Sequence, residues 1–312
     1  MSGNGFNVVA ACPDLAVLRV SGADNLRFLQ AQLSNDVEGL ASNATCKAAW
    51  CDPKGRVLAL FQICKHLDDV LLIAPRAVID THLKRLRLFV LRAKVSLDVD
   101  ESCSVIGIAG GSAEAWLLKQ IHTTDADVSW QETRGAIRLQ GEQRWLLLVE
   151  SSDVEALMES AGLTSECAID TWYAAAIDAG EPTVVTETSG EFVPQMLNLE
   201  LLDGISFSKG CYPGQEIVAR TQYLGRIKRR MYALLSADSE VPSPGTSITD
   251  SNAKTIGKVV YAATADRQAS MLAVLRVDAA AAGNLQLPDG SKLEVATLPY
   301  EIPVAEVPTP TA

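Results

Sequence analysis

Apolar and polar positions alternate in short blocks near the start of the chain. Residues 14–20 alternate with the period of a strand, and residues 21–40 then carry apolar side chains at helical spacing. Ser21 or Asp24 can cap the start of this second segment. We therefore predict a strand and then an amphipathic helix that ends near Asn35 and Asp36. The apolar positions of the helix are Leu26, Leu29, Leu33, Val37 and Leu40.

The next part of the chain, to about residue 150, mixes strand and helix patterns. Its order, β-β-α-β and then β-α-β-β, indicates an α+β layer with helices on one face of a sheet. The expected elements are strands at 56–64 and 70–74, a helix at 75–88, strands at 91–99 and 104–110, a helix at 111–122 and a hairpin at 136–150.

Beyond residue 150 the pattern changes twice. Residues 154–180 predict a helix, a link and a second helix. After Arg230, short apolar segments are separated by SPG, DSN and PDG turns, which predicts a small β-barrel or sandwich. The Pro-rich residues 304–312 are expected to form a flexible tail. The fold class is therefore α+β with a late all-β part.

Composition and charge narrow the class of protein. The chain has 312 residues, of which 48% are hydrophobic and 21% charged, so it can bury the cores of two or three domains. Its net charge of −11 argues against a general polyanion binder, although a local basic site remains compatible with it. The start, MSGNGFNVVAACPDL, lacks the pattern of a secretory signal, and no stretch reaches the roughly 18 apolar residues of a membrane span. We expect a cytoplasmic protein without membrane contact.

The cysteines and histidines do not predict a metal site. The seven cysteines are scattered and never form CxxC, which is typical of a reducing compartment and argues against a disulfide framework or a zinc ribbon. The three histidines, His66, His82 and His122, lie at no metal-ligand spacing from a cysteine or from each other. We predict no bound metal.

One stretch, KGCYPGQEIVAR at residues 209–220, differs from the rest. Pro213 can occupy the first turn of a helix, which would leave Cys211 just before a helix start. The partial positive charge of that start and the Lys209 ammonium would both favour a thiolate, so Cys211 and Lys209 are candidate catalytic residues. A buried, inert cysteine in a turn is the alternative. Glu216 and Arg220, four residues apart, are equally typical of a plain ion pair on a helix surface.

The stretch and four further segments carry a resemblance. KGCYPGQE followed by GRIKRR closely resembles the signature of the YgfZ family, a folate-binding branch of the glycine-cleavage T-protein (aminomethyltransferase) superfamily. The family pattern is roughly K-G-C-Y-x-G-Q-E, and every fixed position is present here. The resemblance extends over nearly the whole chain. The further similar segments, in chain order, are LQAQLSNDV at 29–37, CDPKGRVL at 51–58, AGEP at 179–182 and FVPQMLNLE at 192–200.

The resemblance implies a ring of three domains. A split α/β domain binds folate, a ferredoxin-like domain is inserted into it, and a C-terminal β-barrel closes the ring. On this chain the implied ranges are 1–50 plus 145–230 for the split domain, 51–144 for the insertion and 231–303 for the barrel.

The resemblance also implies a ligand and a role. The cofactor is tetrahydrofolate or a one-carbon derivative, and the role is to support assembly or repair of iron–sulfur enzymes, including one that thiomethylates tRNA. Asp178 falls where T-proteins place a glutamate that grips the pteridine, and a carboxylate can accept two N–H bonds from that ring. A surface acid at the end of a helix is the alternative interpretation of Asp178. Trp172 is a stacking candidate or a plain core residue. The expected cofactor-binding residues are Asn35, Asp36, Trp172, Asp178, Tyr212, Gln215, Glu216 and Arg220.

One departure from the T-protein pattern bears on catalysis. T-proteins carry a catalytic Asp just after the glycine turn, where this chain has Leu58. A leucine exchanges no proton, so aminomethyl transfer is disfavoured and enzymatic activity stays open. The alternatives are a folate-dependent aminomethyltransferase or demethylase acting on a small amine, and a non-catalytic docking protein that binds a partner enzyme or RNA.

Two basic runs suggest local positive patches. GRIKRR is a candidate contact for tRNA or a partner enzyme, through Arg226, Lys228, Arg229 and Arg230. HLKRLRLFVLRAKV at 82–95 has five Lys or Arg and no acid, but Leu83, Leu86 and Val90 favour a solvated helix face with one buried stripe. GIAGGSAEAW lacks the spacing of a phosphate-binding loop and indicates only a tight strand-to-helix turn.

Overall fold

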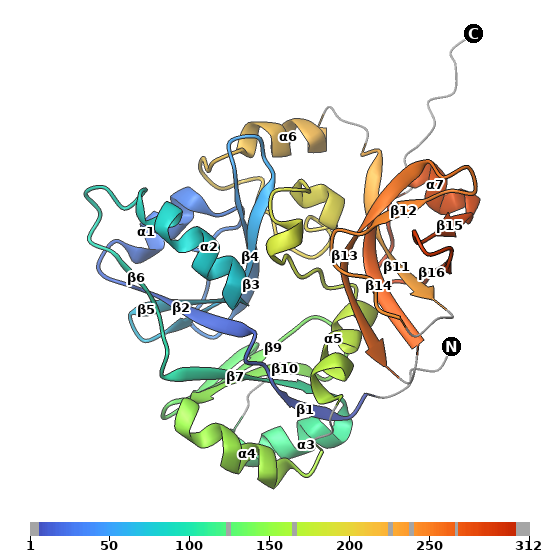
Figure 1. Ribbon diagram of the computed structural model, residues 1–312. Helices are drawn as coiled ribbons and strands as arrows, with labels where there is room; N and C mark the ends of the chain where they lie inside the picture. Colours follow the sequence, from blue (N-terminus) through green and yellow to red (C-terminus); the bar gives the residue numbers. More distant parts are fainter. Residues whose placement is uncertain are drawn as a thin grey trace.

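Two antiparallel sheets and a barrel surround a common centre (Figure 1). The computed structural model describes residues 6–122, 126–163, 167–223, 227–236, 240–265 and 268–303. Arg226 and the predicted tail at 304–312 lie outside these described residues. The α+β class and the C-terminal barrel are confirmed.

The first sheet has the strand order β3-β4-β5-β2-β6 and is buried on both faces. Side chains alternate along β5: Leu71 and Ile73 enter the central core, whereas Leu72 and Ala74 pack under the helices of this unit. Its strands are β2 (Leu15–Ser21), β3 (Thr45–Cys51), β4 (Val57–His66), β5 (Asp69–Pro75) and β6 (Ser96–Val99), and its helices are α1 (Asn25–Gln32) and α2 (Arg76–Arg87).

The second sheet has the order β1-β7-β10-β9-β8. Its first strand comes from the start of the chain, ahead of the whole first sheet, and pairs with β7 from Val8↔Ala109 to Ala11↔Ile106. Its strands are β1 (Val8–Ala11), β7 (Cys103–Ala109), β8 (Val128–Gln131), β9 (Arg134–Arg138) and β10 (Arg144–Glu150), and its helices are α3 (Gly111–Gln120) and α4 (Val154–Ala161).

Strand pairing divides the chain differently from the implied domain ranges. The range boundary at residues 50 and 51 falls inside the β3–β4 hairpin, which pairs from Thr45↔Cys64 to Cys51↔Val57. In chain order, the unit inserted between β1 and β7 is the complete first sheet.

Two sequence predictions in the first sheet are wrong. The helix predicted to end near Asn35 stops at Gln32, because Leu33 takes an extended conformation and bridges to Trp50 of β3. The strand predicted at 91–99 is confined to β6, because the loop before it forms turns.

The remaining elements lead into and complete the barrel. Helix α5 (Ala168–Asp178) packs on β13 of the barrel and on β1 and β7 of the second sheet. The barrel closes in the order β11-β14-β13-β12-β15-β16. These elements are η2 (Thr186–Thr188), η3 (Pro194–Leu197), α6 (Gln215–Tyr223), β11 (Arg229–Ser236), β12 (Ser247–Thr249), β13 (Thr255–Ala265), β14 (Gln268–Arg276), α7 (Val277–Ala282), β15 (Leu285–Gln286) and β16 (Lys292–Ala296).

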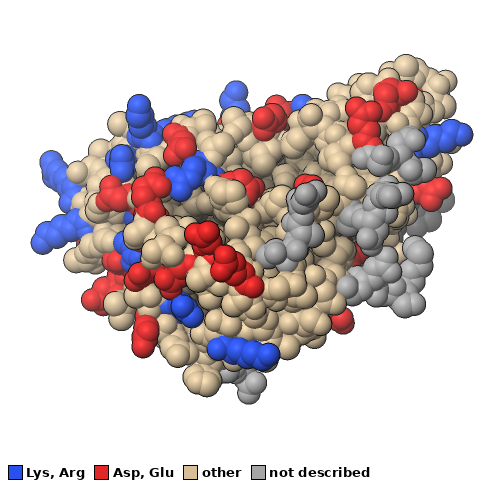
Figure 2. All heavy atoms as spheres, turned by 60° about the horizontal axis from the view of Figure 1, so that its bottom comes forward, with Lys and Arg blue, Asp and Glu red and all other residues tan. Residues whose placement is uncertain are grey.

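The surface carries charges of both signs. Figure 2 shows Lys and Arg side chains projecting from the left edge, on the side where Figure 1 has α1, α2 and β6. No helix in the described parts of the chain is both long and apolar enough to cross a membrane.

Candidate functional site

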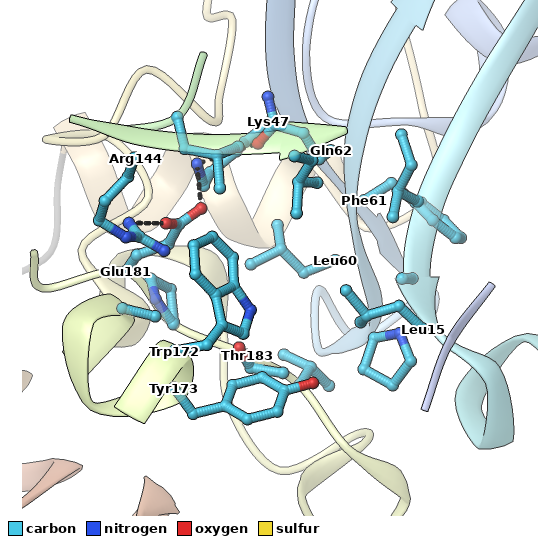
Figure 3. A pocket seen from close by; sticks show the side chains of 18 residues that line it. Leu15, Lys47, Leu60, Phe61, Gln62, Arg144, Trp172, Tyr173, Glu181 and Thr183 are labelled. Carbon is cyan, nitrogen blue, oxygen red and sulfur yellow. Dashed lines mark hydrogen bonds and ion pairs between the residues drawn. The ribbon is translucent and has the colours of Figure 1, made fainter. Parts of the chain in front are cut away.

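A pocket opens where the two sheets meet α5 (Figure 3). The enclosed volume is about 80 Å³, smaller than the roughly 300–1,000 Å³ of most ligand sites, so it can enclose only part of a larger ligand. Lining residues include Leu15, Lys47, Leu60, Gln62, Ile73, Leu139, Arg144, Leu146, Trp172, Tyr173, Ala176, Glu181 and Val184.

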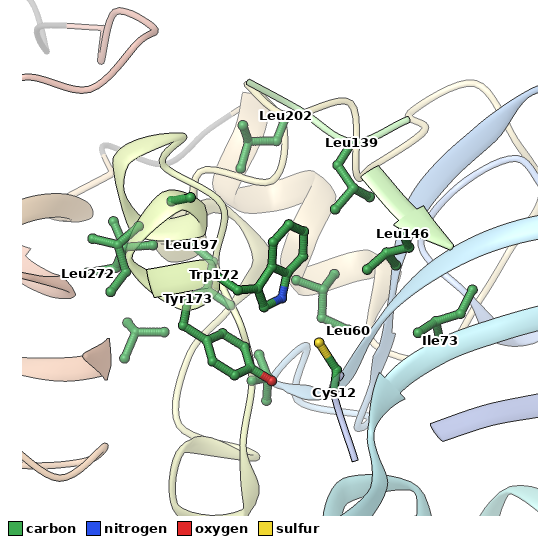
Figure 4. Packing of buried hydrophobic residues seen from close by; sticks show 14 of the residues in the cluster. Cys12, Leu60, Ile73, Leu139, Leu146, Trp172, Tyr173, Leu197, Leu202 and Leu272 are labelled. Carbon is green, nitrogen blue, oxygen red and sulfur yellow. The ribbon is translucent and has the colours of Figure 1, made fainter. Parts of the chain in front are cut away.

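Trp172 of α5 forms one wall of this pocket. Its ring lies against β7 at Gly107, where a side chain would leave no room: a Cβ on this glycine would lie 2.6 Å from Trp172 Cε2. Figure 4 shows the ring packed among leucines from several segments of the chain, including Leu60, Leu139 and Leu146. Trp172 is therefore both a core residue and a pocket wall, with 3% of its surface exposed.

Three buried charged side chains lie beside the tryptophan. Glu181 accepts from Lys47 Nζ at 2.6 Å through one oxygen and from Arg144 at 2.5 Å through the other. The Arg144 guanidinium also lies 4.9 Å from the centre of the Trp172 ring, a cation–π distance. Two cations and one carboxylate give the cluster a net positive charge.

The ion pairs fix the charge state of the carboxylate. Burial alone would raise the pKa of Glu181, but the charges and hydrogen bonds of Lys47 and Arg144 lower it to about 2. Burial and the nearby Asp14 raise the pKa of Tyr173, and the Tyr173 hydroxyl donates to the Asp14 carboxylate. Glu181 therefore stays ionised and Tyr173 stays protonated near neutral pH. These two groups suit binding better than proton transfer.

One hydrogen-bond donor of the cluster is unused. Arg144 Nε is buried and has no hydrogen-bond partner among the described residues, whereas another nitrogen of the same guanidinium donates to the Gln140 carbonyl at 2.7 Å. The Gln62 amide is occupied, because its oxygen accepts from Lys47 and its nitrogen donates to Thr45. A ligand in this pocket would thus meet a flat aromatic wall beside a positively charged cluster.

Of the predicted cofactor-binding residues, Trp172 is among those that line this pocket, whereas Asp178 is not. Asp178 lies exposed at the carboxyl end of α5. The buried carboxylate beside the pocket is Glu181, three residues further along. The structure thus places Glu181, and not Asp178, beside this pocket, and the ligand contact of Asp178 stays a prediction.

Asn35 and Asp36 hold the chain beyond α1. The Asn35 amide donates to the carbonyls of Lys47, at 2.8 Å, and Asp203, at 2.6 Å. The Asp36 carboxylate accepts from Gln30 and from the backbone of Gly39. Their contacts are structural, and through Lys47 they fix the backbone of one pocket residue.

Lys209 clamps the end of α1 from a distant part of the chain. Its ammonium donates to the carbonyls of Gln30 and Leu33, each at 2.5 Å, and of Asn35 at 3.0 Å. Burial lowers the pKa of Lys209 to about 8, with nearby carboxylates acting in the opposite direction. The lysine therefore donates hydrogen bonds to carbonyl groups that have no partner within helix α1.

Cys211 is exposed, and α6 begins only at Gln215. The predicted position directly before a helix start is therefore wrong, because Pro213 and Gly214 form a turn between them. Neither Cys211 nor Lys209 lines the pocket beside Trp172. Tyr212 is buried, and its ring lies 5.2 Å from Lys209 Nζ.

The other predicted residues of this stretch lie on α6. Gln215 is half-buried, whereas Glu216 and Arg220 are exposed and do not form one of the ion pairs seen among the described residues. None of the three lines the pocket.

Arg230 is not available for a partner. It is 5% exposed and forms an ion pair with Glu200, and it also donates to the Gln195 carbonyl at 3.2 Å. Its inclusion in a surface patch is therefore wrong, because it joins the barrel to the segment after α5. Lys228 is exposed and Arg229 is half-buried.

Leu58 packs in the apolar core under α1 and α2, with 7% of its surface exposed. It is not among the residues that line the pocket. The Leu58 side chain thus supplies only apolar contact, while its carbonyl accepts from the Ser189 hydroxyl at 2.8 Å.

Sequence reasoning missed Lys47, Arg144 and Glu181. Lys47 lies within the largely apolar strand β3 and Arg144 begins the largely apolar strand β10, a signal that a buried charge needs a partner. Glu181 stands inside AGEP, one of the similar segments. Nowhere in the described residues do three or more His, Cys, Asp or Glu side chains gather so that they could hold a metal ion.

Comparisons with known proteins agree with this architecture. No family model matches the chain. The tRNA-modifying protein YgfZ of Yersinia enterocolitica is 30% identical over 300 residues, covering 93% of this chain and 91% of that protein. Its counterpart in Colwellia psychrerythraea is 34% identical over 227 residues, covering 72% and 70%. Among solved structures, the glycine cleavage system aminomethyltransferase T from Bartonella henselae matches with a TM-score of 0.75 over 95% of this chain and 86% of that chain. At 14% identity, this match shows a shared fold.

Proposed function

The chain belongs to the family of the tRNA-modifying protein YgfZ, and from that premise we propose that it supports tRNA modification by binding tetrahydrofolate, or a one-carbon derivative, beside Trp172. The observation that carries the proposal is the pairing of the flat Trp172 wall with the positively charged cluster of Lys47, Arg144 and Glu181. A pteridine ring is flat and carries acceptor atoms on its edge, so both features have a counterpart in this ligand.

The charged cluster favours one orientation of the ring. Glu181 has each oxygen engaged by a cation, so the cluster offers donors to a ligand. The acceptor edge of a pteridine therefore faces Arg144. Because the enclosed volume is about 80 Å³, only part of the ring system is covered, and the rest of the ligand lies at the opening.

Bound tetrahydrofolate would supply a carrier for a one-carbon fragment. The residues of this chain hold the ring: Trp172 stacks on it, Arg144 donates to it, and Glu181 keeps both neighbouring cations in place. Catalysis by proton transfer is not proposed for these groups.

The finer role that we propose is maintenance of iron–sulfur enzymes, including tRNA-thiomethylating ones, with Cys211 as a second working point. Its exposure makes the thiol accessible to another protein. One cysteine is too few to hold a cluster alone, so any cluster contact would be shared with the client.

The two alternatives receive less support. Aminomethyl transfer to a small amine lacks an acid at Leu58, which is packed in a core. Docking of a partner through GRIKRR cannot use Arg230, because this residue is buried in an ion pair.

Calorimetry with tetrahydrofolate tests the ligand. We expect micromolar binding by the wild type, binding at least tenfold weaker in Arg144→Lys and Trp172→Leu, and unchanged binding in the matched control Asp178→Ala. Near-ultraviolet circular dichroism checks that each variant is folded. A wild type that does not bind, or a loss confined to Asp178→Ala, refutes the proposed site.

The role of the thiol has its own test. In a deletion strain of a bacterium that carries a relative, we expect Cys211→Ala to restore less tRNA thiomethylation than Cys167→Ala, which removes the other exposed thiol. Full restoration by Cys211→Ala would remove the thiol from the mechanism.

A further inference from the structure

The loop that joins α2 to β6 exposes three large apolar side chains close together. Leu88 is 74% exposed, Phe89 40% and Leu91 89%. Single exposed apolar residues are ordinary, but adjacent ones mark contact surfaces. In Figure 1 this loop lies at the left edge of the molecule, and we call these residues, with the cations around them, the α2–β6 patch.

Leu91 is costly to the fold. Its φ is +46°, in the left-handed region, where a residue other than glycine or asparagine loses about 1–2 kcal/mol. The side chain buries almost nothing within the chain to offset this loss. A strained and exposed leucine is therefore explained better by a contact outside the chain than by packing inside it.

Five cations flank these apolar side chains along the chain. Lys84, Arg85 and Arg87 occupy the last turn of α2, where the helix dipole alone would favour them. Arg92 and Lys94 lie beyond the helix, so the dipole does not account for them. Both are exposed, and neither takes part in an ion pair within the described part of the chain.

Few carboxylates offset this charge. Asp98 pairs with Arg87 at 2.9 Å. The Asp24 carboxylate accepts from the backbone N–H of Lys94 at 2.8 Å, and the Asp24 N–H donates back to the Lys94 carbonyl at 3.3 Å. These bonds, and Val90 packed against the core below, hold the loop in one conformation before any partner arrives.

We infer that the α2–β6 patch binds a protein that presents an apolar pocket ringed by carboxylates. The apolar centre and cationic rim match the anatomy of a protein interface. An RNA or an anionic membrane fits less well, because such extended polyanions would meet the net charge of −11 on the whole chain, whereas a compact acidic ring meets only the patch. Phe89 is the one ring among the three apolar side chains, and it already lies edge to face with Trp50.

This surface is separate from the proposed ligand site. None of its residues lines the pocket beside Trp172. The inference therefore goes beyond the proposed function and does not depend on folate binding.

Site-specific photo-crosslinking in the native cells tests the inference. A benzophenone side chain replaces Leu91 in one sample and Leu118, a 49% exposed leucine on α3, in the matched control. We expect an adduct with another protein from position 91 only, mapped by mass spectrometry to a carboxylate-rich segment. Arg92→Glu with Lys94→Glu should lower its yield about tenfold or more, whereas Lys119→Glu should leave it unchanged.

Other outcomes overturn the inference. They are an adduct with RNA, with lipid or with a second copy of this chain, equal adducts from both positions, no adduct from position 91, or a yield that the charge reversal leaves intact. Thermal unfolding of each variant separates lost binding from lost folding.

Discussion

Gly55 and Gly214 lie directly against each other, so that the glycine turn of CDPKGRVL meets the turn of KGCYPGQE. A Cβ on Gly214 would lie 2.6 Å from Gly55 Cα, and a Cβ on Gly55 would lie 3.2 Å from the Gly214 carbonyl oxygen. Both residues have positive φ, +72° and +80°. Each glycine is thus required twice, by its own backbone and by the other turn.

Gly214→Ala should therefore destabilise the fold. We expect the free energy of unfolding to fall by about 2–4 kcal/mol, from positive-φ strain and from contact with the opposite backbone. Denaturant unfolding measures the change. Gly210→Ala in the same stretch is the matched control, because a Cβ there meets nothing within 4 Å. Equal losses in both variants would contradict the packing argument.

Lys209→Met should also be destabilising, although it keeps the length of the side chain. Three carbonyls at the end of α1 lose their charged donor, and we expect a loss of about 1–3 kcal/mol in the free energy of unfolding. Lys54→Met, at an exposed lysine in the other turn, should change little. An unchanged free energy of unfolding in Lys209→Met would mean that water replaces the ammonium without loss of stability.

The Glu181 carboxylate should make stability depend on pH. Its pKa in the folded state is about 2, below the ordinary value of 4.5, so its contribution is complete above about pH 4.5 and is lost as pH falls toward 2. The contribution is on the order of 3 kcal/mol. The difference in unfolding free energy between the wild type and Glu181→Gln should shrink across this window. A difference that stays constant would contradict the ion-paired state.

Charge reversal separates the two arginines at the start of the barrel. Arg230→Glu places a second carboxylate beside Glu200 in a buried site and should cost at least about 3 kcal/mol of stability. Arg229→Glu, at a half-buried position, should be close to neutral. Thermal unfolding measures both. A stable Arg230→Glu protein would restore this residue as a candidate contact surface.

The thiols should fall into two groups. Cys211 and Cys167 are exposed and should be alkylated within minutes at pH 8 in the native protein. Cys12, Cys51 and Cys64 are buried, and desolvation raises each pKa to about 12, so they should react only after unfolding. Mass spectrometry counts the modified sites. Rapid labelling of Cys64 would indicate that the first sheet opens.

Local patterns of apolar and polar residues predicted most of the helices and strands. Helix α2 and the strands β11, β13 and β14 form where periodicity predicts them, because the spacing of apolar side chains follows from the local geometry of each element. The predicted end of α1 failed because Lys209, far along the chain, takes the carbonyls that would have continued the helix.

The pocket was less accessible to sequence reasoning. Lys47, Arg144 and Glu181 belong to three segments that meet only in the folded chain, so spacing gives no sign of their contact. Trp172 was found because an aromatic side chain on a helix is a candidate by type alone. Asp178 was predicted from its place in the similar segments of the family. The side chain is exposed at the end of α5, and the buried carboxylate beside the pocket is Glu181.

The place of β1 in the second sheet has a consequence during synthesis. Val8–Ala11 leaves the ribosome before its partner strand, Cys103–Ala109, which is made about 90 residues later. At roughly 5–20 residues per second, the apolar segment VVAA waits about 5–20 s without its neighbour. The first sheet, encoded entirely in between, can fold during that interval. The nascent chain can thus complete the first sheet before β1 is paired, and during this interval a chaperone would have the most unpaired apolar strand to cover.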